Sequence, residues 1–161
     1  MPEAEISPLF HHCCGSSEWV HLMVHSRPFK SESQLLAWAQ KFWMDLEHEE
    51  WIKAFESHPA IGEKKIEASG ENDLHTQWSR DEQSRVINAD HQTLSKLIEK
   101  GQVYKKQFGY IYLVCATGKT ASEMLGILED RLQNKPELEI KIAAREQSKI
   151  TALRLEKLLK A

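Results

Sequence analysis

The chain has few cysteines, no long apolar run and no excess of basic residues. Its 161 residues include 3 cysteines, and the formal net charge is −3. So few cysteines, two of them adjacent, do not make the disulfide framework of a small secreted domain. The net negative charge gives no electrostatic basis for binding nucleic acid or an anionic membrane. The longest apolar run, which includes Ile111–Ala116, is far shorter than the ~20 residues of a membrane-spanning helix.

The length and composition are typical of one soluble globular domain. A hydrophobic fraction of 41% with 28% charged residues is ordinary for such a domain, and the 161 residues are enough for a substantial core. The amino end carries Glu3 and Glu5 and lacks the basic-then-apolar pattern of a signal peptide, and the carboxyl end carries no peroxisomal tripeptide. We therefore expect a single domain over residues 1–161 and a cytoplasmic location.

Apolar residues recur at every third or fourth position along most of the chain, which is the pattern of amphipathic helices. Capping and breaking residues predict where several of these helices begin and end. The predicted limits are a start at Ser31–Gln34, a helix from Thr120 to near Asn134, a helix from Pro136 to Leu159, and a helix from about 80 to 100 that stops near Gly101.

The segment Phe108–Gly118 does not follow the helical period. Its β-branched and aromatic residues suggest a strand, but no second convincing strand exists to pair with it, and a lone strand is not stable. We therefore predict an all-α fold, a single-domain helical bundle with an extended crossing segment near residues 109–117. Such a segment leaves backbone N–H and C=O groups free of helix bonding, and a polar, planar ligand could satisfy them.

A histidine followed by a proline stands in the segment Ser57–Gly62. Pro59 keeps His58 out of the α region, so a helix arriving through Trp51–Phe55 is expected to stop at the histidine. An imidazole with an unperturbed pKa of ~6.5 both gives and takes a proton near neutral pH. The alternative, a helix-terminal histidine that only caps carbonyls, is favoured by residue type alone.

A second polar group, Ser79–Gln83, follows about twenty residues later. Ser79 and Glu82 have the spacing of a capping box, and spacing alone favours that structural role. In the functional interpretation, Glu82 is the partner of His58, while Ser79 and Gln83 form hydrogen bonds with a heterocycle. Sequence spacing does not decide between the two interpretations.

Histidines and cysteines also cluster near the amino end of the chain. Residues 11–14 read His-His-Cys-Cys, whereas zinc ligands usually stand two to four residues apart with a second pair elsewhere, and no such second pair exists. His21 and His25 have helical i,i+4 spacing but no accompanying carboxylate motif, which favours a solvated helix face. We expect no bound metal.

Further blocks accompany the motifs around His58 and Glu82 in a fixed order along nearly the whole chain. They are Cys14–Trp19, Met23, Arg27–Phe29, Ala54–Gly62, Trp78–Gln83, Tyr104, Phe108–Tyr110, Ala116–Lys119, Arg131–Asn134, Glu146, Ile150 and Arg154–Leu155. In these blocks the chain resembles the decarboxylases of 2-oxo-4-hydroxy-4-carboxy-5-ureidoimidazoline (OHCU), the enzymes of the third step from urate to (S)-allantoin.

The resemblance implies an all-helical homodimeric carboxy-lyase that acts on a small molecule and uses neither a metal nor an organic cofactor. It implies that His58 is the catalytic acid and base, with Glu82 as its partner. It also implies a set of substrate-binding residues, of which residues 112–116 act through their backbone: Pro59, Ser79, Gln83, Tyr112, Leu113, Val114, Cys115, Ala116 and Arg154.

Two other classes of function stay open at this point. One is a catalytically silent helical binding protein that keeps the pocket, and the presence of His58 and Glu82 argues against it. The other is a metal-dependent hydrolase of an allantoin-like ring that uses the histidines between His11 and His25. Metal analysis of the purified protein separates that hydrolase from a decarboxylase.

Overall fold

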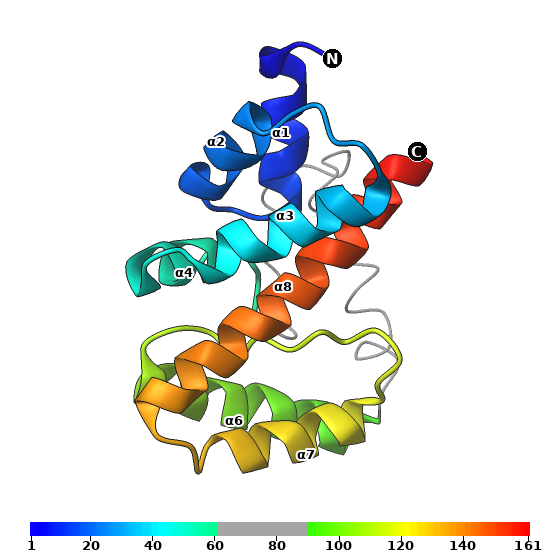
Figure 1. Cartoon of the computed structure of the whole chain (residues 1–161). Coiled ribbons are helices and arrows are strands. Elements are labelled where there is room, and N and C mark those ends of the chain that lie inside the picture. Colours follow the sequence, from blue (N-terminus) through cyan, green and yellow to red (C-terminus); the bar gives the residue numbers. More distant parts are fainter. Residues whose placement is uncertain (61–89) are drawn as a thin grey trace. The chain divides into compact units, whose positions relative to one another are not determined.

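The computed structural model describes residues 1–60 and 90–161. Over these residues the chain forms seven helices and no strand (Figure 1), so the all-α prediction is confirmed. The helices are α1 (Glu3–Cys13), α2 (Ser17–His25), α3 (Glu32–Met44), α4 (His48–Phe55), α6 (His91–Phe108), α7 (Ala121–Arg131) and α8 (Pro136–Lys160). Within the described ranges, no helix is both long and apolar enough to cross a membrane.

The chain divides into two compact units. The first comprises Met1–Ser57 with Ala144–Ala161, and the second comprises His58–Ala143. Helices α1 to α4 and the larger part of α8 therefore belong to the first unit, while α6, α7 and the first turns of α8 belong to the second. A single domain over residues 1–161 stays a prediction.

Three buried tryptophans hold the helices of the first unit together. Each indole N–H donates to a backbone carbonyl on another helix or turn: Trp19 to Ala39 at 3.0 Å, Trp43 to Ala144 at 2.8 Å, and Trp51 to Trp43 at 2.8 Å. Large apolar rings with one satisfied polar group suit a core of this kind. These bonds connect α2 with α3, α3 with α8, and α4 with α3.

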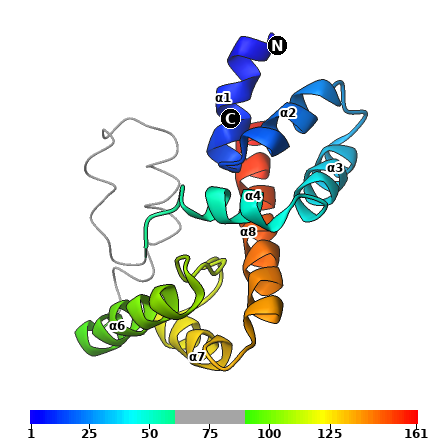
Figure 2. The same cartoon turned by 90° about the vertical axis from the view of Figure 1, so that its left-hand side faces the viewer.

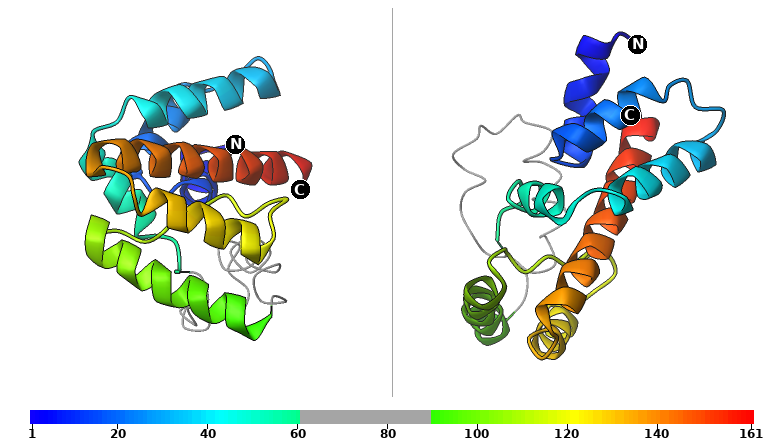
Figure 3. Two further views of the ribbon diagram at one scale, coloured as in Figure 1. Left: turned by 90° about the horizontal axis from the view of Figure 1, so that it is seen from below. Right: turned by 60° about the vertical axis from the view of Figure 1, so that its left-hand side comes forward.

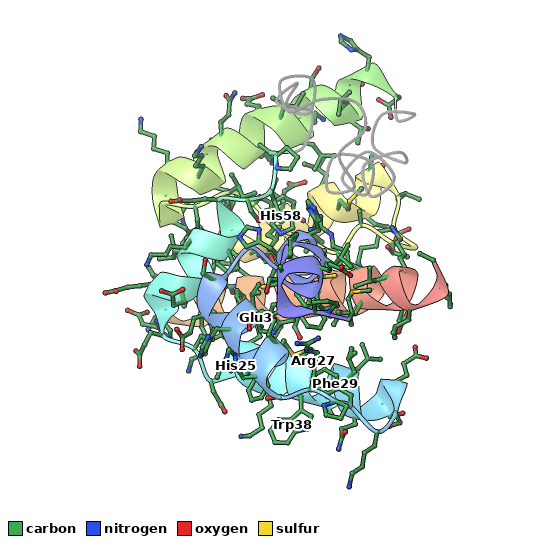
Figure 4. All side chains as sticks on the ribbon, turned by 90° about the horizontal axis from the view of Figure 1, so that it is seen from above. Glu3, His25, Arg27, Phe29, Trp38 and His58 are labelled. Carbon is green, nitrogen blue, oxygen red and sulfur yellow. The ribbon has the colours of Figure 1, made fainter. Side chains whose placement is uncertain are left out.

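One tryptophan of the first unit lies at the surface. Trp38 is 38% exposed and stacks on Phe42 of the same helix, with 5.1 Å between ring centroids. Its side chain extends away from the helices (Figure 4). The i,i+4 spacing of the two rings accounts for the stacking.

In the second unit, α6 and α7 lie side by side and run in the same direction (Figures 2 and 3). Two neighbouring helices that run the same way need a connection that returns along their length. α7 has 11 residues, about 16 Å at ~1.5 Å per residue, and extended chain covers that distance in the fewest residues. Residues 111–116 accordingly lie outside any helix or strand, which confirms the extended segment predicted near 109–117.

The predicted helix starts at Ser31 and Thr120 are confirmed. The Ser31 hydroxyl accepts a hydrogen bond from the Gln34 N–H at 3.1 Å, and the Thr120 hydroxyl accepts one from the Glu123 N–H at 3.1 Å. α8 begins at Pro136, as its missing N–H and fixed φ favour. α7 ends at Arg131, a few residues before the predicted limit near 134, and a turn follows it.

The helix end predicted near Gly101 is wrong. Gly101 lies inside α6, with buried Leu97 before it and buried Tyr104 after it, so packing on both sides carries the helix through the glycine. α6 ends instead at Gly109, whose φ of 88° is in the left-handed region that favours glycine. The predicted start near residue 80 lies outside the described residues; α6 begins at His91.

Candidate active site

α4 ends before His58, as predicted. Its last helical residue is Phe55, and both the N–H and the hydroxyl of Ser57 donate to the Ala54 carbonyl, at 3.1 and 2.7 Å. Pro59 cannot continue the helix because it lacks an N–H and restricts the residue before it. His58 is 9% exposed, so a nearly buried imidazole follows directly after the helix end.

A close approach within the first unit fixes the residue before His58. A Cβ built on Gly15 would lie 2.6 Å from the Ser57 Oγ, so the loop between α1 and α2 packs against the end of α4. A side chain at position 15 would displace the hydroxyl that closes the helix. Gly15 lies in the block Cys14–Trp19, one of those that carry the family resemblance, but no pattern in the sequence assigns it this role.

The extended segment of the second unit is buried and held by two cations. Residues 112–115 are each 9% exposed or less. Arg131 Nη1 donates to the Leu113 carbonyl at 2.7 Å, and Lys119 Nζ donates to the Cys115 carbonyl at 2.8 Å. Two carbonyls of the segment are therefore occupied by side chains of the protein.

Arg131 is part of a buried network that sequence patterns did not predict. Its Nε and Nη2 donate to Glu139 Oε2 at 2.9 and 2.7 Å, and the Tyr104 hydroxyl donates to the same carboxylate. Arg131 is 5% exposed and Glu139 and Tyr104 are 0% exposed. The guanidinium carbon lies 5.0 Å from the ring centroid of Tyr112. All three polar side chains are thus satisfied within the second unit.

The protonation states of this network follow from its burial. Desolvation raises the pKa of Tyr104 far above its usual range, although the charge of Arg131 opposes the shift. Burial alone would lower the pKa of Arg131, but its hydrogen bonds to Glu139 raise it overall. Tyr104 therefore stays a neutral donor and Arg131 a cation at any physiological pH.

Arg154 lies on α8 in the first unit and is 1% exposed. Its Nη1 donates to the His12 carbonyl at 3.0 Å. Burial raises the pKa of Cys13 and of Cys14 to about 12, and the positive charge of Arg154 opposes both shifts. Both thiols are therefore neutral at physiological pH.

The predicted site residues fall into three groups. His58, Pro59 and residues 112–116 belong to the second unit, and Arg154 belongs to the first. Ser79, Glu82 and Gln83 lie outside the described residues. Their roles and those of the other site residues stay predictions.

The amino-terminal histidines and cysteines show no metal-binding geometry. Among residues 1–60 and 90–161, no three histidine, cysteine, aspartate or glutamate side chains group as ligands for a metal ion. His21 and His25 are exposed on α2, and His25 Nδ1 lies 2.9 Å from the His21 carbonyl oxygen. The predicted solvated helix face is confirmed.

The helical fold, the nearly buried His58 before a proline and the buried extended segment can be compared with known proteins. The sequence model described as OHCU decarboxylase matches residues 1–156. The chain therefore belongs to the OHCU decarboxylase family, the carboxy-lyases of uric acid degradation that form allantoin.

Two curated relatives match most of the chain. The uric acid degradation bifunctional protein TTL of Arabidopsis thaliana is 37% identical over 147 residues, which cover 91% of this chain and 45% of the relative. The uric acid degradation bifunctional protein of Bacillus sp. (strain TB-90) is 28% identical over 151 residues, which cover 90% of this chain and 28% of the relative. The chain thus spans less than half the length of either relative.

Two solved structures share the fold. The crystal structure of an OHCU decarboxylase in the presence of (S)-allantoin has a TM-score of 0.81 and 35% identity, and the match covers 96% of this chain and 99% of that one. The crystal structure of an (S)-allantoin synthase has a TM-score of 0.70 and 18% identity, over 98% of this chain and 50% of that one. The second match concerns the fold alone.

Proposed function

We propose that this chain decarboxylates OHCU to (S)-allantoin, without a cofactor, with His58 as the proton shuttle. The observation that carries this proposal is the match to an OHCU decarboxylase solved in the presence of (S)-allantoin, at 35% identity over 96% of this chain. The buried His58 after α4 is consistent with it, because a desolvated site strengthens the interactions that guide a proton.

The reaction requires two events at two adjacent ring carbons. The bond to the carboxyl carbon breaks and carbon dioxide leaves, and the electron pair delocalises into the conjugated bonds of the imidazoline ring. A proton then reaches the neighbouring carbon, which bears the ureido group, on one face and gives a single enantiomer, while the hydroxyl on the first carbon loses its proton and becomes the carbonyl of allantoin. Positioning, electrostatics and proton transfer accomplish this without a Lewis acid or a Schiff base in the proposed mechanism.

His58 delivers and accepts the proton, and Glu82 fixes its tautomer and orientation. Pro59 lines the pocket beside it. Ser79 and Gln83 form hydrogen bonds with the ureido group and the ring edge. These roles rest on the family resemblance.

Arg154 and the backbone of residues 112–116 complete the proposed site. Arg154 binds a carboxylate or carbonyl oxygen through its planar guanidinium fork. It does not clamp the departing carboxylate tightly, since stabilising the ground state does not speed the reaction. The buried backbone of the extended segment forms hydrogen bonds with the polar edges of the planar substrate.

The proposed assembly is a homodimer that binds a small-molecule substrate and neither nucleic acid nor membrane. Two-fold dimers are the commonest soluble oligomers. The family resemblance implies one here, and the net charge of −3 offers no attraction to polyanions.

The test supplies OHCU made freshly from urate by the upstream oxidation and hydrolysis, and follows circular dichroism of the allantoin formed. Because OHCU decays spontaneously to racemic allantoin, the expected result is faster formation of the (S)-enantiomer in proportion to protein concentration. Racemic product at the spontaneous rate would reject the proposed function.

A further inference from the structure

Arg131 binds a backbone carbonyl of the extended segment. This bond fixes the orientation of one peptide unit, and that orientation determines which backbone group is available to a ligand. A trans peptide unit is planar, so its C=O and the following N–H point in opposite directions. The Leu113 carbonyl is bound to Arg131 Nη1 at 2.7 Å. The Val114 N–H, in the same peptide unit, therefore points away from Arg131.

The same geometry recurs two residues later. Lys119 Nζ holds the Cys115 carbonyl at 2.8 Å, which directs the Ala116 N–H away from Lys119. Neither the Val114 N–H nor the Ala116 N–H has a partner among residues 1–60 and 90–161. Val114 is 9% exposed, and a buried N–H without a partner is costly, so an acceptor atom of a ligand stabilises it.

Arg131 can hold this carbonyl firmly because the rest of its guanidinium is fixed. Glu139 accepts from its Nε and Nη2, and the Tyr104 hydroxyl donates to Glu139. The three side chains are buried, and the ion pair leaves no net charge within the network. The guanidinium therefore has Nη1 available for the Leu113 carbonyl, and its other bonds restrict its movement away from that carbonyl.

We propose that Arg131, held by Glu139 and Tyr104, is a positioning residue of the decarboxylase: it acts through the Leu113 carbonyl to aim the Val114 N–H at an acceptor oxygen of the substrate. This inference rests on the proposed function. It assigns a role to a residue outside the proposed set of catalytic and substrate-binding residues. The substrate group it selects is a carbonyl or carboxylate oxygen, because an N–H donor would oppose another donor.

The main test is Arg131→Lys. Lysine keeps a positive charge beside Glu139, so the buried carboxylate is not left unpaired, but one ammonium cannot reproduce the fork that reaches Glu139 and Leu113 together. We expect a folded protein whose kcat/KM for OHCU falls about 10²-fold, the scale of a misplaced contact remote from the chemistry. If Arg131→Lys does not fold, the combined Arg131→Met, Glu139→Leu and Tyr104→Phe variant removes all the polar groups together and replaces it in the test.

A second readout separates positioning from mere support of the fold. In the wild type, saturation with (S)-allantoin should shift the backbone amide resonance of Val114, and in the variant that shift should be lost. The matched control is Lys100→Met with Glu129→Leu, which removes an ion pair between α6 and α7 whose side chains are 38% and 48% exposed. The control should keep kcat/KM within about twofold.

The outcomes are distinguishable. A folded variant with wild-type kcat/KM and a retained Val114 shift would overturn the positioning role while leaving the decarboxylase intact. A wild-type protein that does not exceed spontaneous decay of OHCU would instead overturn the proposed function on which the inference rests.

Discussion

Cys13 and Cys14 stand side by side in the first unit, and burial raises the pKa of each thiol to about 12. In the unfolded chain a thiol titrates near ~8.5. Between those two values the unfolded chain loses protons that the folded chain keeps, so the free energy of unfolding falls as pH rises. The loss is at most about 1.4 kcal/mol per pH unit for each thiol, and none is expected below the unfolded pKa.

Urea unfolding of the wild type and of Cys13→Ala/Cys14→Ala at about pH 8 and about pH 10 checks this prediction. The wild type should lose more stability between the two pH values than the double variant. Tyrosines and lysines titrate in both proteins, so their contributions cancel. Equal losses would show that the thiols do not titrate as buried groups.

Glu82→Gln separates a capping role from an active-site role. A glutamine still makes the return bond of a capping box, so a pure cap predicts an unchanged rate. If Glu82 orients His58 and favours its protonated form, turnover should fall by at least about tenfold and the pH profile of turnover should shift, while the melting temperature barely changes. The matched control is Glu123→Gln at the Thr120 cap of α7, which should leave turnover as it was. Turnover of Glu82→Gln at the level of that control would favour the cap.

Single residues differ in how much of their role the sequence reveals. The helix end before His58 was predictable because Pro59 acts on the adjacent residue through local sterics. The burial of Arg131 was not predictable. An arginine in the last turn of a helix is usually exposed to solvent, where its positive charge interacts with the negative end of the helix dipole. Its partner Glu139 comes from the next helix, and only the folded unit brings the two together.

Two glycines of α6 allow a paired test at the scale of a helix. Gly109→Ala should destabilise the protein by about 1–2 kcal/mol, because a Cβ is strained in the left-handed region, and φ there is 88°. Gly101→Ala should stabilise it by about 0.5–1 kcal/mol, because alanine loses less backbone freedom in a helix interior. No described atom lies within 4 Å of either added Cβ, so the effect is one of backbone conformation.

Chemical denaturation of both variants measures whether each substitution raises or lowers the free energy of unfolding. A loss for Gly101→Ala would mean that α6 does not run continuously through position 101. A gain for Gly109→Ala would contradict the left-handed helix end.

Some helix ends are set by the neighbouring sequence, and others are set by packing in the folded chain. The starts at Ser31 and Thr120 were predictable because a capping hydroxyl needs only the next turn. The end of α6 was not, because Gly101 is an acceptable stop by sequence, and only the burial of Leu97 and Tyr104 overrides it. The extended segment was predictable as non-helical, but its length follows from the parallel course of α6 and α7 (Figure 1).

At the scale of the whole molecule, a single domain over residues 1–161 stays a prediction beside the two compact units of the structure. Periodicity and family resemblance favour one domain, and the family match runs over residues 1–156. The folded chain groups into two compact units, with α8 contributing to both. Sequence patterns report local period and order, and they do not reveal which helices group together.

Assembly and metal independence are tested on the intact protein. We predict a homodimer by sedimentation and full activity after exhaustive chelation, because none of His58, Glu82 and Arg154 is proposed as a metal ligand. Sedimentation as a monomer would overturn the assembly alone. Activity lost on chelation and restored by zinc would overturn the mechanism and favour the metal-dependent hydrolase.

The most direct test of the central claim compares the wild type with His58→Ala in the initial rate of (S)-allantoin formation from fresh OHCU. Removal of a general acid and base costs roughly 10²–10⁴-fold, so the variant should fall by that factor and its residual product should approach the racemic spontaneous mixture. Far-ultraviolet circular dichroism should show unchanged helicity, since a histidine that only caps α4 would cost a little stability and no turnover. Enantiopure (S)-allantoin formed at the wild-type rate by folded His58→Ala would contradict the account.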